Sequence, residues 1–547
     1  MTGSVRTRTA LLDVSAADFL YHNGKIATVD GEFSIADGVA VLGGRVVGVG
    51  RGEELRGLVG RRTTVVDLGG RTVVPGFVDS HSHPYAKALG ESKIDLRPCR
   101  SVQEILEKVE LRSRELPPGE WVEAGVGWRT AWLAEQRMPT RKELDAVAPD
   151  NPVFLPHLGY TVMLNSAALA AAGIDRDTVA PGGGDILRDE AGEPTGEIVG
   201  IPAIRPVERL IPEPSLDARL AGLRFMCRQN LAMGKTSAID AGVFPEGIRT
   251  YQEANQRGEL TVRTSVMPRP DTTLPLPQVL ESVRAWGVRT GFGDDMLKLS
   301  GIKMFLDGGI EGAHQREPYV GRPDYFGQVT TDPTVVREVA MLAAELGWDV
   351  GVHACGGAAM DTLLDIYEEV DARYPLKDRR FSLIHGFFPD ERTFERCRRL
   401  NVPVAVQQTL LYNLATNFIA EWGAERVAMA SPHRDYLDQG VMLGGGVDGT
   451  PFEILLAIWS CITRETRDEG IIGPGQRITR EEALRMYTSG SAYVMHEETV
   501  KGALEIGKYG DMVVLDRDLL TCPVEEIKET SVIATIVGGE VRYGEVE

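Results

Sequence analysis

Two histidines separated by a single residue carry the strongest chemical signal in this sequence. His81 and His83 stand in the segment VVPGFVDSHSHP, at the end of an apolar run. In a β-strand, residues i and i+2 point to the same face, so both imidazoles can bind one metal ion. The alternative is a pair of ordinary polar histidines at a strand end, and an HxH pair by itself is weak evidence. The apolar run and the Pro-Gly pair within it favour the metal site.

Four further residues of ligand type lie in or near the ends of other apolar runs. Lys303 lies within LSGIKMFLDGG, His353 ends WDVGVHA, His385 ends FSLIHG and Asp448 ends VMLGGGVDG. Lysine is rarely buried unless it is paired or modified, so Lys303 in an apolar run needs a reason. Each residue alone is more often a satisfied polar side chain than a ligand. Together with the two histidines they occupy five strand ends, and that coincidence indicates a metal centre.

Short apolar runs followed by helix-like segments must position these side chains. Such alternation predicts a parallel α/β architecture. Eight runs are candidate strands, at residues 73–80, 236–241, 262–267, 297–306, 349–354, 381–385, 403–407 and 441–447. Eight strands close a (β/α)8 TIM-type barrel, in which active sites form at the C-terminal ends of the strands. The ligand-type residues fall on the first, fourth, fifth, sixth and eighth runs.

The two ends of the chain have a different pattern. They are rich in β-branched residues, and the turn sequences NGK, GGR and GGR predict hairpins. The runs are residues 19–30, 39–49 and 64–74 at the N-terminal end, with 511–516 and 532–543 at the C-terminal end. Because isolated hairpins are marginally stable, we expect both ends to form one small composite β-sandwich domain.

These patterns predict three regions. The composite β-sandwich domain takes residues 1–75 and 502–547, and the metal-dependent barrel takes residues 76–84 and 235–501. Residues 85–234 are far longer than a usual crossover, so we expect a large insertion after barrel strand 1: an inserted subdomain or lid together with the start of barrel helices.

Composition excludes several classes of protein. The 547 residues are 43% hydrophobic and 25% charged, which excludes a disordered, collagen-like or coiled-coil chain. The formal charge of −20 argues against a broad basic face for nucleic acid. No run approaches the ~20 apolar residues of a membrane helix, and the N-terminus lacks the pattern of a signal peptide. Six scattered cysteines without a CxxC pair favour a reducing compartment, so we expect a cytoplasmic protein that binds neither nucleic acid nor membrane.

Taken together, the motifs resemble the amidohydrolase superfamily, and within it the YtcJ-like branch (amidohydrolase family 3), which includes deformylases of N-substituted formamides. VVPGFVDSHSH resembles the opening metal motif of the family, and residues 140–174 are similar to an insertion characteristic of the branch. IKMFLDG, VHACGGAAMDTLLDIYE, LIHG and VDGTPF occupy the expected later positions. The sequence departs from the branch pattern after His353, where Gly356 and Gly357 stand in place of a common Gly-Asp pair.

The resemblance implies a centre of one or two metal ions per chain, usually Zn2+, although the donors also suit other divalent metals. Its six ligands would be His81, His83, Lys303, His353, His385 and Asp448. The more buried metal would be bound by His81, His83 and Asp448. The second metal would be bound by His353 and His385, and a carbamylated Lys303 would bridge the two metals. The metals would activate water and polarise the scissile carbonyl. Asp448 would carry the proton of that water to the leaving amine, so Asp448, Lys303 and His385 are the predicted catalytic residues.

Six other residues are candidates for contact with substrate: Asp307, His314, Trp128, His157, Tyr160 and Gln407. Asp307 and His314 follow the Lys303 run on a glycine-rich loop, where a purely structural role is the equal alternative. Core packing is the alternative for Trp128 and Tyr160. A nucleophilic thiol at Cys355, two residues beyond His353, is unnecessary where a metal activates water.

We therefore expect a metal-dependent hydrolase that cleaves a C–N amide-type bond, as in an N-substituted amide or formamide. Two alternatives stay open: a hydrolase of a cyclic amide, urea or ester on the same centre, and a non-catalytic metal-binding regulatory protein. The intact set of ligands argues against the latter, since an inactive relative would be free to lose Lys303 or Asp448. The expected partner is a small-molecule substrate, and a homodimer is compatible with the sequence.

Overall fold

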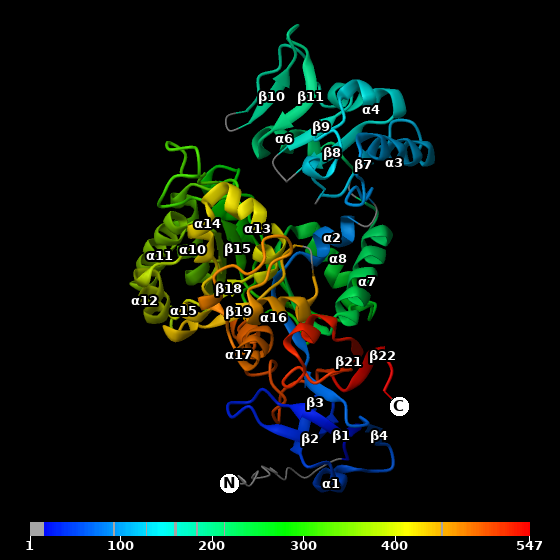
Figure 1. Cartoon of the computed structure of the whole chain (residues 1–547), viewed down its shortest axis with the longest axis vertical. Helices are drawn as coiled ribbons and strands as arrows, with labels where there is room; N and C mark the ends of the chain where they lie inside the picture. The colour runs from blue at the N-terminus through cyan, green and yellow to red at the C-terminus, as the bar shows by residue number, and fades with distance from the viewer. Residues whose placement is uncertain are drawn as a thin grey trace. The chain divides into compact units, whose positions relative to one another are not determined.

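The computed structural model describes residues 16–90, 93–126, 128–157, 161–181, 184–212, 214–449 and 452–546 (Figure 1). Contacts between Cα atoms divide the chain into a larger unit, Met1–Pro84 with Arg224–Glu547, and an inserted unit, Tyr85–Leu223. In the described ranges, no helix has both the length and the apolar character that a bilayer span requires.

Strands from both ends of the chain form one eight-stranded sheet in the larger unit. Its order is β22-β21-β20-β5-β1-β2-β3, and β4 pairs with β1 off this path. The two chain ends meet where β20 pairs antiparallel with β5, with Val513 opposite Val74. The strands are β1 (Phe19–Ala27), β2 (Ile35–Leu42), β3 (Arg45–Gly50), β4 (Thr64–Asp67), β5 (Thr72–Pro75), β20 (Met512–Leu515), β21 (Val532–Val537) and β22 (Glu540–Gly544).

Two of the predicted terminal hairpins are wrong. NGK lies inside β1 as a bulge, where the register with β2 shifts between His22 and Ile26 and the strand then continues. The last GGR does not reverse the chain into a hairpin, because β4 and β5 both run parallel to β1. Only the middle turn joins a hairpin, β2 to β3, where Gly43 and Gly44 take φ values of 57° and 77°. In the described residues, the strands of both chain ends hydrogen-bond into one continuous sheet, and the sandwich arrangement stays a prediction.

Two parallel sheets of the larger unit carry the predicted ligands. One has the order β14-β13-β12-β6 and the other β15-β16-β17-β18-β19. The strands are β6 (Phe77–Ser82), β12 (Lys235–Val243), β13 (Arg263–Pro268), β14 (Leu297–Leu299), β15 (Ile302–Phe305), β16 (Val350–Ala354), β17 (Phe381–His385), β18 (Val404–Val406) and β19 (Leu443–Gly445). The predicted mixed α/β class with parallel sheets is therefore confirmed.

Two of the eight predicted runs each contain two strands. Residues 73–80 cover the end of β5 and the start of β6, which belong to different sheets. The break falls at Gly76, where a Cβ atom would lie 2.1 Å from Oγ1 of Thr236. Residues 297–306 contain β14 and β15. The N–H of Ser300 donates to a carbonyl of β13 at 3.0 Å, whereas the N–H of Ile302 donates to Asp349, just before β16, at 2.9 Å.

Amphipathic helices cover the parallel sheets. In α10, for example, Asp332 caps the N-terminus by accepting from the N–H of Thr334, Val336 and Val339 are buried, and Gly347 ends the helix at φ 81°. Figure 1 shows α10, α11 and α12 side by side in the larger unit. The larger unit also has α1 (Gly52–Leu55), which packs on β2 of the terminal sheet. Its remaining helices are α8 (Pro245–Gln256), α9 (Leu276–Ala285), α10 (Pro333–Leu346), α11 (Gly357–Asp371), α12 (Glu391–Leu400), α13 (Gln408–Trp422), α14 (Ala424–Ala428), α15 (His433–Asp438), α16 (Ile454–Thr463), α17 (Arg480–Arg485) and α18 (Ser491–Val494).

The inserted unit has its own five-stranded sheet, in the order β10-β11-β9-β8-β7. β10 and β11 form an antiparallel pair at one edge of this sheet. The strands are β7 (Val122–Glu123), β8 (Val153–His157), β9 (Thr161–Leu164), β10 (Asp185–Arg188) and β11 (Pro194–Val199). The helices are α2 (Pro84–Gly90), α3 (Val102–Glu115), α4 (Arg141–Val147), α5 (Ser166–Ala171), α6 (Ile201–Glu208) and α7 (Leu216–Ala232), of which α7 carries the chain back into the larger unit.

Candidate metal centre

His81, His83 and Asp448 come together at the C-terminal ends of β6 and β19. Nε2 of His83 lies 3.1 Å from Oδ1 of Asp448, and the ring centroids of His81 and His83 are 5.1 Å apart. One ligand atom from each of the three residues lies within 4.8 Å of the others. The HxH pair and the aspartate, 365 positions apart in the sequence, thus form one cluster, which we call the first cluster.

The backbone holds the first cluster in place. The N–H of Asp448 donates to the carbonyl of His81 at 2.9 Å, and Ser82 and Asp448 form a parallel bridge. Asp448 adopts φ of 52°, a left-handed conformation that aspartate and asparagine tolerate better than most residues. Nδ1 of His83 lies 2.8 Å from the carbonyl oxygen of Ala241. That contact places the proton on Nδ1 and leaves Nε2 as the donor atom for a metal.

His353, Cys355 and His385 form a second cluster at the ends of β16 and β17. The ring centroids of His353 and His385 are 4.4 Å apart, and Sγ of Cys355 lies 3.3 Å from Nε2 of His353. One donor atom from each residue again lies within 4.8 Å of the others. The rings of His81 and His385 are 5.3 Å apart, so the two clusters adjoin.

Lys303 lies on β15, next to β16, and its side chain is fully buried. Its Nζ has no hydrogen-bond partner among the described residues and lies 4.6 Å from the centroid of the Phe305 ring. Burial lowers the pKa of Lys303 to about 7, because the ammonium loses its water shell. A buried lysine without a partner is unfavourable, so this position indicates that another group pairs with it or modifies it.

The imidazoles of His81, His353 and His385 and the carboxylate of Asp448 have ionisation states that suit a cation. His83 differs: burial lowers its pKa, but the hydrogen bond with Asp448 and the charge of that carboxylate raise the pKa above the usual value, so a bound metal would have to displace the proton on Nε2. Burial lowers the pKa of His81 and His353 well below the usual value, and that of His385 to about 4. Burial opposes ionisation of Asp448, but its hydrogen bond with His83 and the nearby histidines hold its pKa well below the usual value. Neutral imidazoles and an ionised carboxylate are the forms that bind a divalent metal.

The polar atoms of the site fit a metal. Nδ1 of His81, Nδ1 of His385 and Nζ of Lys303 are buried and have no hydrogen-bond partner within the part of the chain that the structure describes. Buried polar atoms nearly always have a partner, so three such atoms at adjoining clusters indicate a group that binds there. Imidazole and carboxylate donors in these numbers are typical of zinc-like ions.

Asp307 organises the loops around the second cluster. Its carboxylate accepts the backbone N–H groups of Cys355 at 3.0 Å, Gly356 at 2.8 Å and His314 at 2.9 Å. The carbonyl of His314 in turn accepts two N–H groups at the start of α11. For Asp307 these contacts support the structural alternative, because backbone donors occupy both of its oxygens.

The other predicted substrate contacts are dispersed. Trp128 and His157 belong to the inserted unit, where their ring centroids are 5.0 Å apart and the Trp128 Nε1–H donates to a carbonyl of β8. Tyr160 lies outside the described residues. Gln407 is buried after β18 in the larger unit, and its Oε1 has no partner among the described residues. Contact of these side chains with substrate stays a prediction.

Arg269 and Phe305 were not predicted from the sequence. Arg269 follows β13, and its guanidinium carbon lies 4.5 Å from the centroid of the Phe305 ring. That ring is also 5.3 Å from the ring of His353. The guanidinium group of Arg269 therefore lies near the second cluster, at the C-terminal ends of the strands. The sequence offered one signal for Arg269, namely a charged residue directly after the third predicted strand of the barrel, which is β13.

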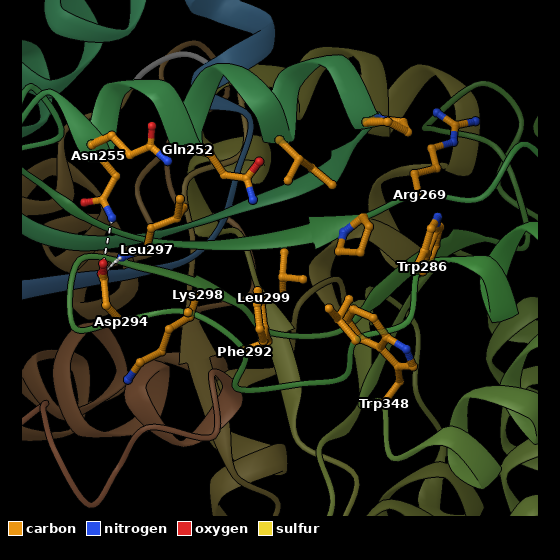
Figure 2. A pocket seen from close by; sticks show the side chains of 16 residues that line it. Gln252, Asn255, Arg269, Trp286, Phe292, Asp294, Leu297, Lys298, Leu299 and Trp348 are labelled. Atoms are coloured by element: carbon orange, nitrogen blue, oxygen red, sulfur yellow. Dashed lines mark hydrogen bonds between the residues drawn. The ribbon is translucent and has the colours of Figure 1, made fainter.

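A separate cavity of about 430 Å³ lies along α8 (Figure 2). Its lining is largely apolar and includes Trp286, Phe292 and Trp348. At one end, Nδ2 of Asn255 donates to Oδ2 of Asp294 at 2.7 Å. None of the six predicted ligands lines this cavity. The candidate metal centre is therefore identified by its buried polar atoms without partners among the described residues, and not by the volume of a cavity.

Comparison with known families identifies the chain. The sequence model described as "Amidohydrolase family" matches residues 64–543. The chain belongs to the amidohydrolase family. The match includes both parallel sheets, the inserted unit and the strands of the terminal sheet from β4 onward, and it confirms the family predicted from the motifs. With two clusters of metal-ligand type at its strand ends, this amidohydrolase is a metal-dependent hydrolase.

Individual relatives match the amidohydrolase over most of its length. N-substituted formamide deformylase from Arthrobacter pascens is 31% identical over 546 residues, which cover 96% of this chain and 98% of that protein. The crystal structure of an uncharacterised metal-dependent hydrolase from Pyrococcus horikoshii OT3 is similar with a TM-score of 0.77 at 24% identity, covering 93% of this chain and 99% of that chain. A second such hydrolase, from Pyrococcus furiosus, has a TM-score of 0.73 at 26% identity, covering 92% and 100%.

Proposed function

We propose that this amidohydrolase uses Zn2+ to hydrolyse the C–N bond of an N-substituted amide or formamide. The observation that carries the proposal is the pair of adjoining clusters beside a buried lysine without a partner among the described residues. The similarity to N-substituted formamide deformylase, which extends over 96% of this chain, supports the substrate class.

Six side chains would hold the metal ions: His81, His83, Lys303, His353, His385 and Asp448. When bound, zinc lowers the pKa of water and polarises a carbonyl group. Asp448 is suited to move the proton, because its carboxylate is ionised and lies 3.1 Å from His83 in the first cluster. It takes a proton from the attacking water and returns it to the nitrogen as the C–N bond breaks, which releases an amine and a carboxylic acid.

We propose that Lys303 is carbamylated. Burial lowers its pKa to about 7, so that near neutral pH a large fraction of the amine is uncharged and nucleophilic. The neutral amine adds carbon dioxide, which forms one N–C bond and releases one proton. A buried cation is thereby replaced by an anion with two oxygens. Those oxygens would be available to metal ions at both clusters, and bound cations would stabilise the negative charge.

We also propose that the two parallel sheets close into one (β/α)8 barrel. The bridge between Ser82 and Asp448 supports closure on the side of β6 and β19. On the other side, Ser300 and Ile302, two positions apart in the β14–β15 segment, hydrogen-bond toward different sheets. The composite terminal domain, the lid at residues 85–234 and a homodimer stay predictions. All six cysteines are free thiols, which supports a reducing compartment such as the cytoplasm.

A hydrolysis screen over N-formyl, N-acyl, urea and lactam compounds tests the function. We expect zinc-loaded protein to turn over N-substituted formamides or amides, to lose turnover on chelation and to regain it with zinc. A preference for lactams or ureas would favour the cyclic-substrate alternative. Inactivity of fully metallated protein across the whole screen would contradict hydrolysis and favour a non-catalytic role.

A further inference from the structure

We propose that a cavity where α13 meets α14 binds a small carboxylic acid with an apolar body, at a site apart from the metal centre. The cavity has a volume of about 660 Å³, and pockets for small molecules measure about 300–1,000 Å³. It lies within the larger unit, and none of the six predicted metal ligands lines it. Binding at this cavity does not depend on the proposed hydrolysis.

Two buried nitrogen atoms without a partner indicate a ligand in this cavity. Nε2 of Gln315 and Nη1 of Arg426 belong to residues that line it, and neither atom has a hydrogen-bond partner in the part of the chain that the structure describes. Gln315 is only 4% exposed, so bulk water does not solvate its amide group. Buried polar atoms nearly always have a partner, so two such atoms at one cavity point to a group that binds there.

The hydrogen-bonding capacity that these residues leave unused is of the donor type. Oε1 of Gln315 accepts the N–H of Gly357 at 3.4 Å, and that contact assigns the amide nitrogen to the other end of the group. The carbonyl of Phe388 already accepts Nη1 of Arg316 at 3.0 Å. The ligand must therefore supply acceptor oxygens. A carboxylate suits the two free donors, because one oxygen can face the guanidinium of Arg426 and the other the amide of Gln315.

The charges around the cavity favour a single negative charge over a dianion such as phosphate. Nη2 of Arg426 pairs with Oε2 of Glu317 at 2.9 Å, and Nε of Arg316 pairs with Asp361 at 2.7 Å. Both cations are therefore partly neutralised, and the exposed Glu425 also lines the cavity. The side chain of Glu317 is 72% exposed, so water and salt screen its repulsion of one carboxylate.

Apolar side chains supply a wall for the body of the ligand. Phe388 and Trp422 both line the cavity, and their ring centroids are 4.8 Å apart with the rings edge to face at 89°. Met429 also lines it, and its flexible thioether can adapt to the shape of a ligand. An aromatic or branched aliphatic acid would bury carbon against these side chains while its carboxylate meets the two donors.

Isothermal titration calorimetry of zinc-loaded protein with benzoate, and with benzamide as its neutral counterpart, tests the site. We expect benzoate to bind at least about tenfold more tightly, because hydrogen bonds to a charged group are the stronger. Gln315→Glu keeps the shape of the side chain and an acceptor for Gly357, but it replaces the free donor with a negative charge. This variant and Arg426→Met should each weaken benzoate binding at least about tenfold. Benzoate that binds to zinc would be common to the wild type and both variants.

Two control variants separate the loss of a donor from general effects. Met429→Leu changes an apolar residue of the same cavity. Arg399→Met removes the same charge as Arg426→Met from α12, where the Arg399 side chain is 49% exposed and does not line the cavity. Both controls should keep the wild-type affinity for benzoate within about twofold.

Crystals of zinc-loaded protein soaked in 4-bromobenzoate locate the ligand through the anomalous signal of bromine. We expect bromine in the cavity of the wild type and none there in Arg426→Met. Bromine only at the metal centre or at lattice contacts, an adventitious additive only, would overturn the proposal. So would equal affinity for benzamide, or benzoate affinity that neither donor variant lowers. Should Gln315→Glu fail to fold, Arg426→Met beside Arg399→Met still decides. Protein that binds benzoate here but hydrolyses nothing would contradict the proposed function alone.

Discussion

Replacement of Asp448 by asparagine should separate the chemistry of this residue from its place in the fold. Asparagine has almost the same size, and it tolerates the φ of 52° that Asp448 adopts. The backbone hydrogen bond from residue 448 to the carbonyl of His81 does not involve the side chain. We therefore expect the free energy of unfolding to change by no more than about 1 kcal/mol.

Turnover by the Asp448→Asn variant should fall much further. An amide cannot accept the proton of water, and loss of such a general base lowers kcat by about 10²–10⁴-fold. That loss corresponds to about 3–5 kcal/mol in the activation free energy. Because the pKa of Asp448 is held well below the usual value, the wild-type carboxylate is ionised at neutral and at alkaline pH, and the loss should be similar at both.

The assay compares initial rates on an N-substituted formamide with the zinc content and the circular dichroism of the same sample. Asp438→Asn is the control, since the Asp438 side chain is 61% exposed and pairs with Arg434 on α15. It should keep the wild-type rate. A loss of less than about tenfold in Asp448→Asn protein that is folded and retains its metal would refute the assignment of this carboxylate as the base.

Three further changes probe the centre and the fold that holds it. Lys303→Met should lower the metal content per chain and remove a labile mass addition equal to carbon dioxide in intact-mass spectra. If the variant keeps the wild-type metal content and the same mass addition, Lys303 is not carbamylated. Gly356→Ala should weaken metal binding in equilibrium dialysis, because its Cβ would lie 2.0 Å from the carbonyl oxygen of His314, and wild-type affinity would show that this turn is not needed. Glu497→Gln should lower the free energy of unfolding by about 3–5 kcal/mol, because it leaves the buried ammonium of Lys501 without its counter-charge. Burial opposes ionisation of Glu497, yet the nearby lysines lower its pKa from 4.5 to about 2. The stabilisation that Glu497 provides is therefore complete above about pH 4.5 and is lost as the pH falls toward 2. A difference in unfolding free energy between wild type and variant that stays constant over this pH range would contradict the ion pair.

The ligand positions could be predicted because their signals are local. The alternation of His81 and His83 at a strand end, and the polar residue that closes each later apolar run, follow from strand geometry and from the position of parallel strand ends. The structure brings the four histidines and Asp448 into two adjoining clusters, and Lys303 is buried on β15 next to the strand that carries His353. Arg269 and Phe305 could not be predicted in the same way, because their approach to the second cluster depends on tertiary structure.

The errors arose where the sequence does not specify the pairing partner. An apolar run such as residues 73–80 gives no sign that its two halves join different sheets, and only the close approach of Gly76 to Thr236 shows the break. NGK is a common turn sequence, but here Asn23 adopts φ of 58° within a bulge. For Trp128 the core-packing alternative agrees with the structure, because the residue is buried in a hydrophobic cluster of the inserted unit; only its contact with the His157 ring depends on tertiary structure that the sequence does not specify.

The metal content of purified protein, measured beside its turnover, decides whether this centre works as described. We predict one to two zinc-like ions per chain, loss of hydrolysis when they are removed by a chelator, and recovery when zinc is returned. A protein that is free of metal, folded and fully active would contradict metal-dependent hydrolysis and, with it, the roles given to all six ligands.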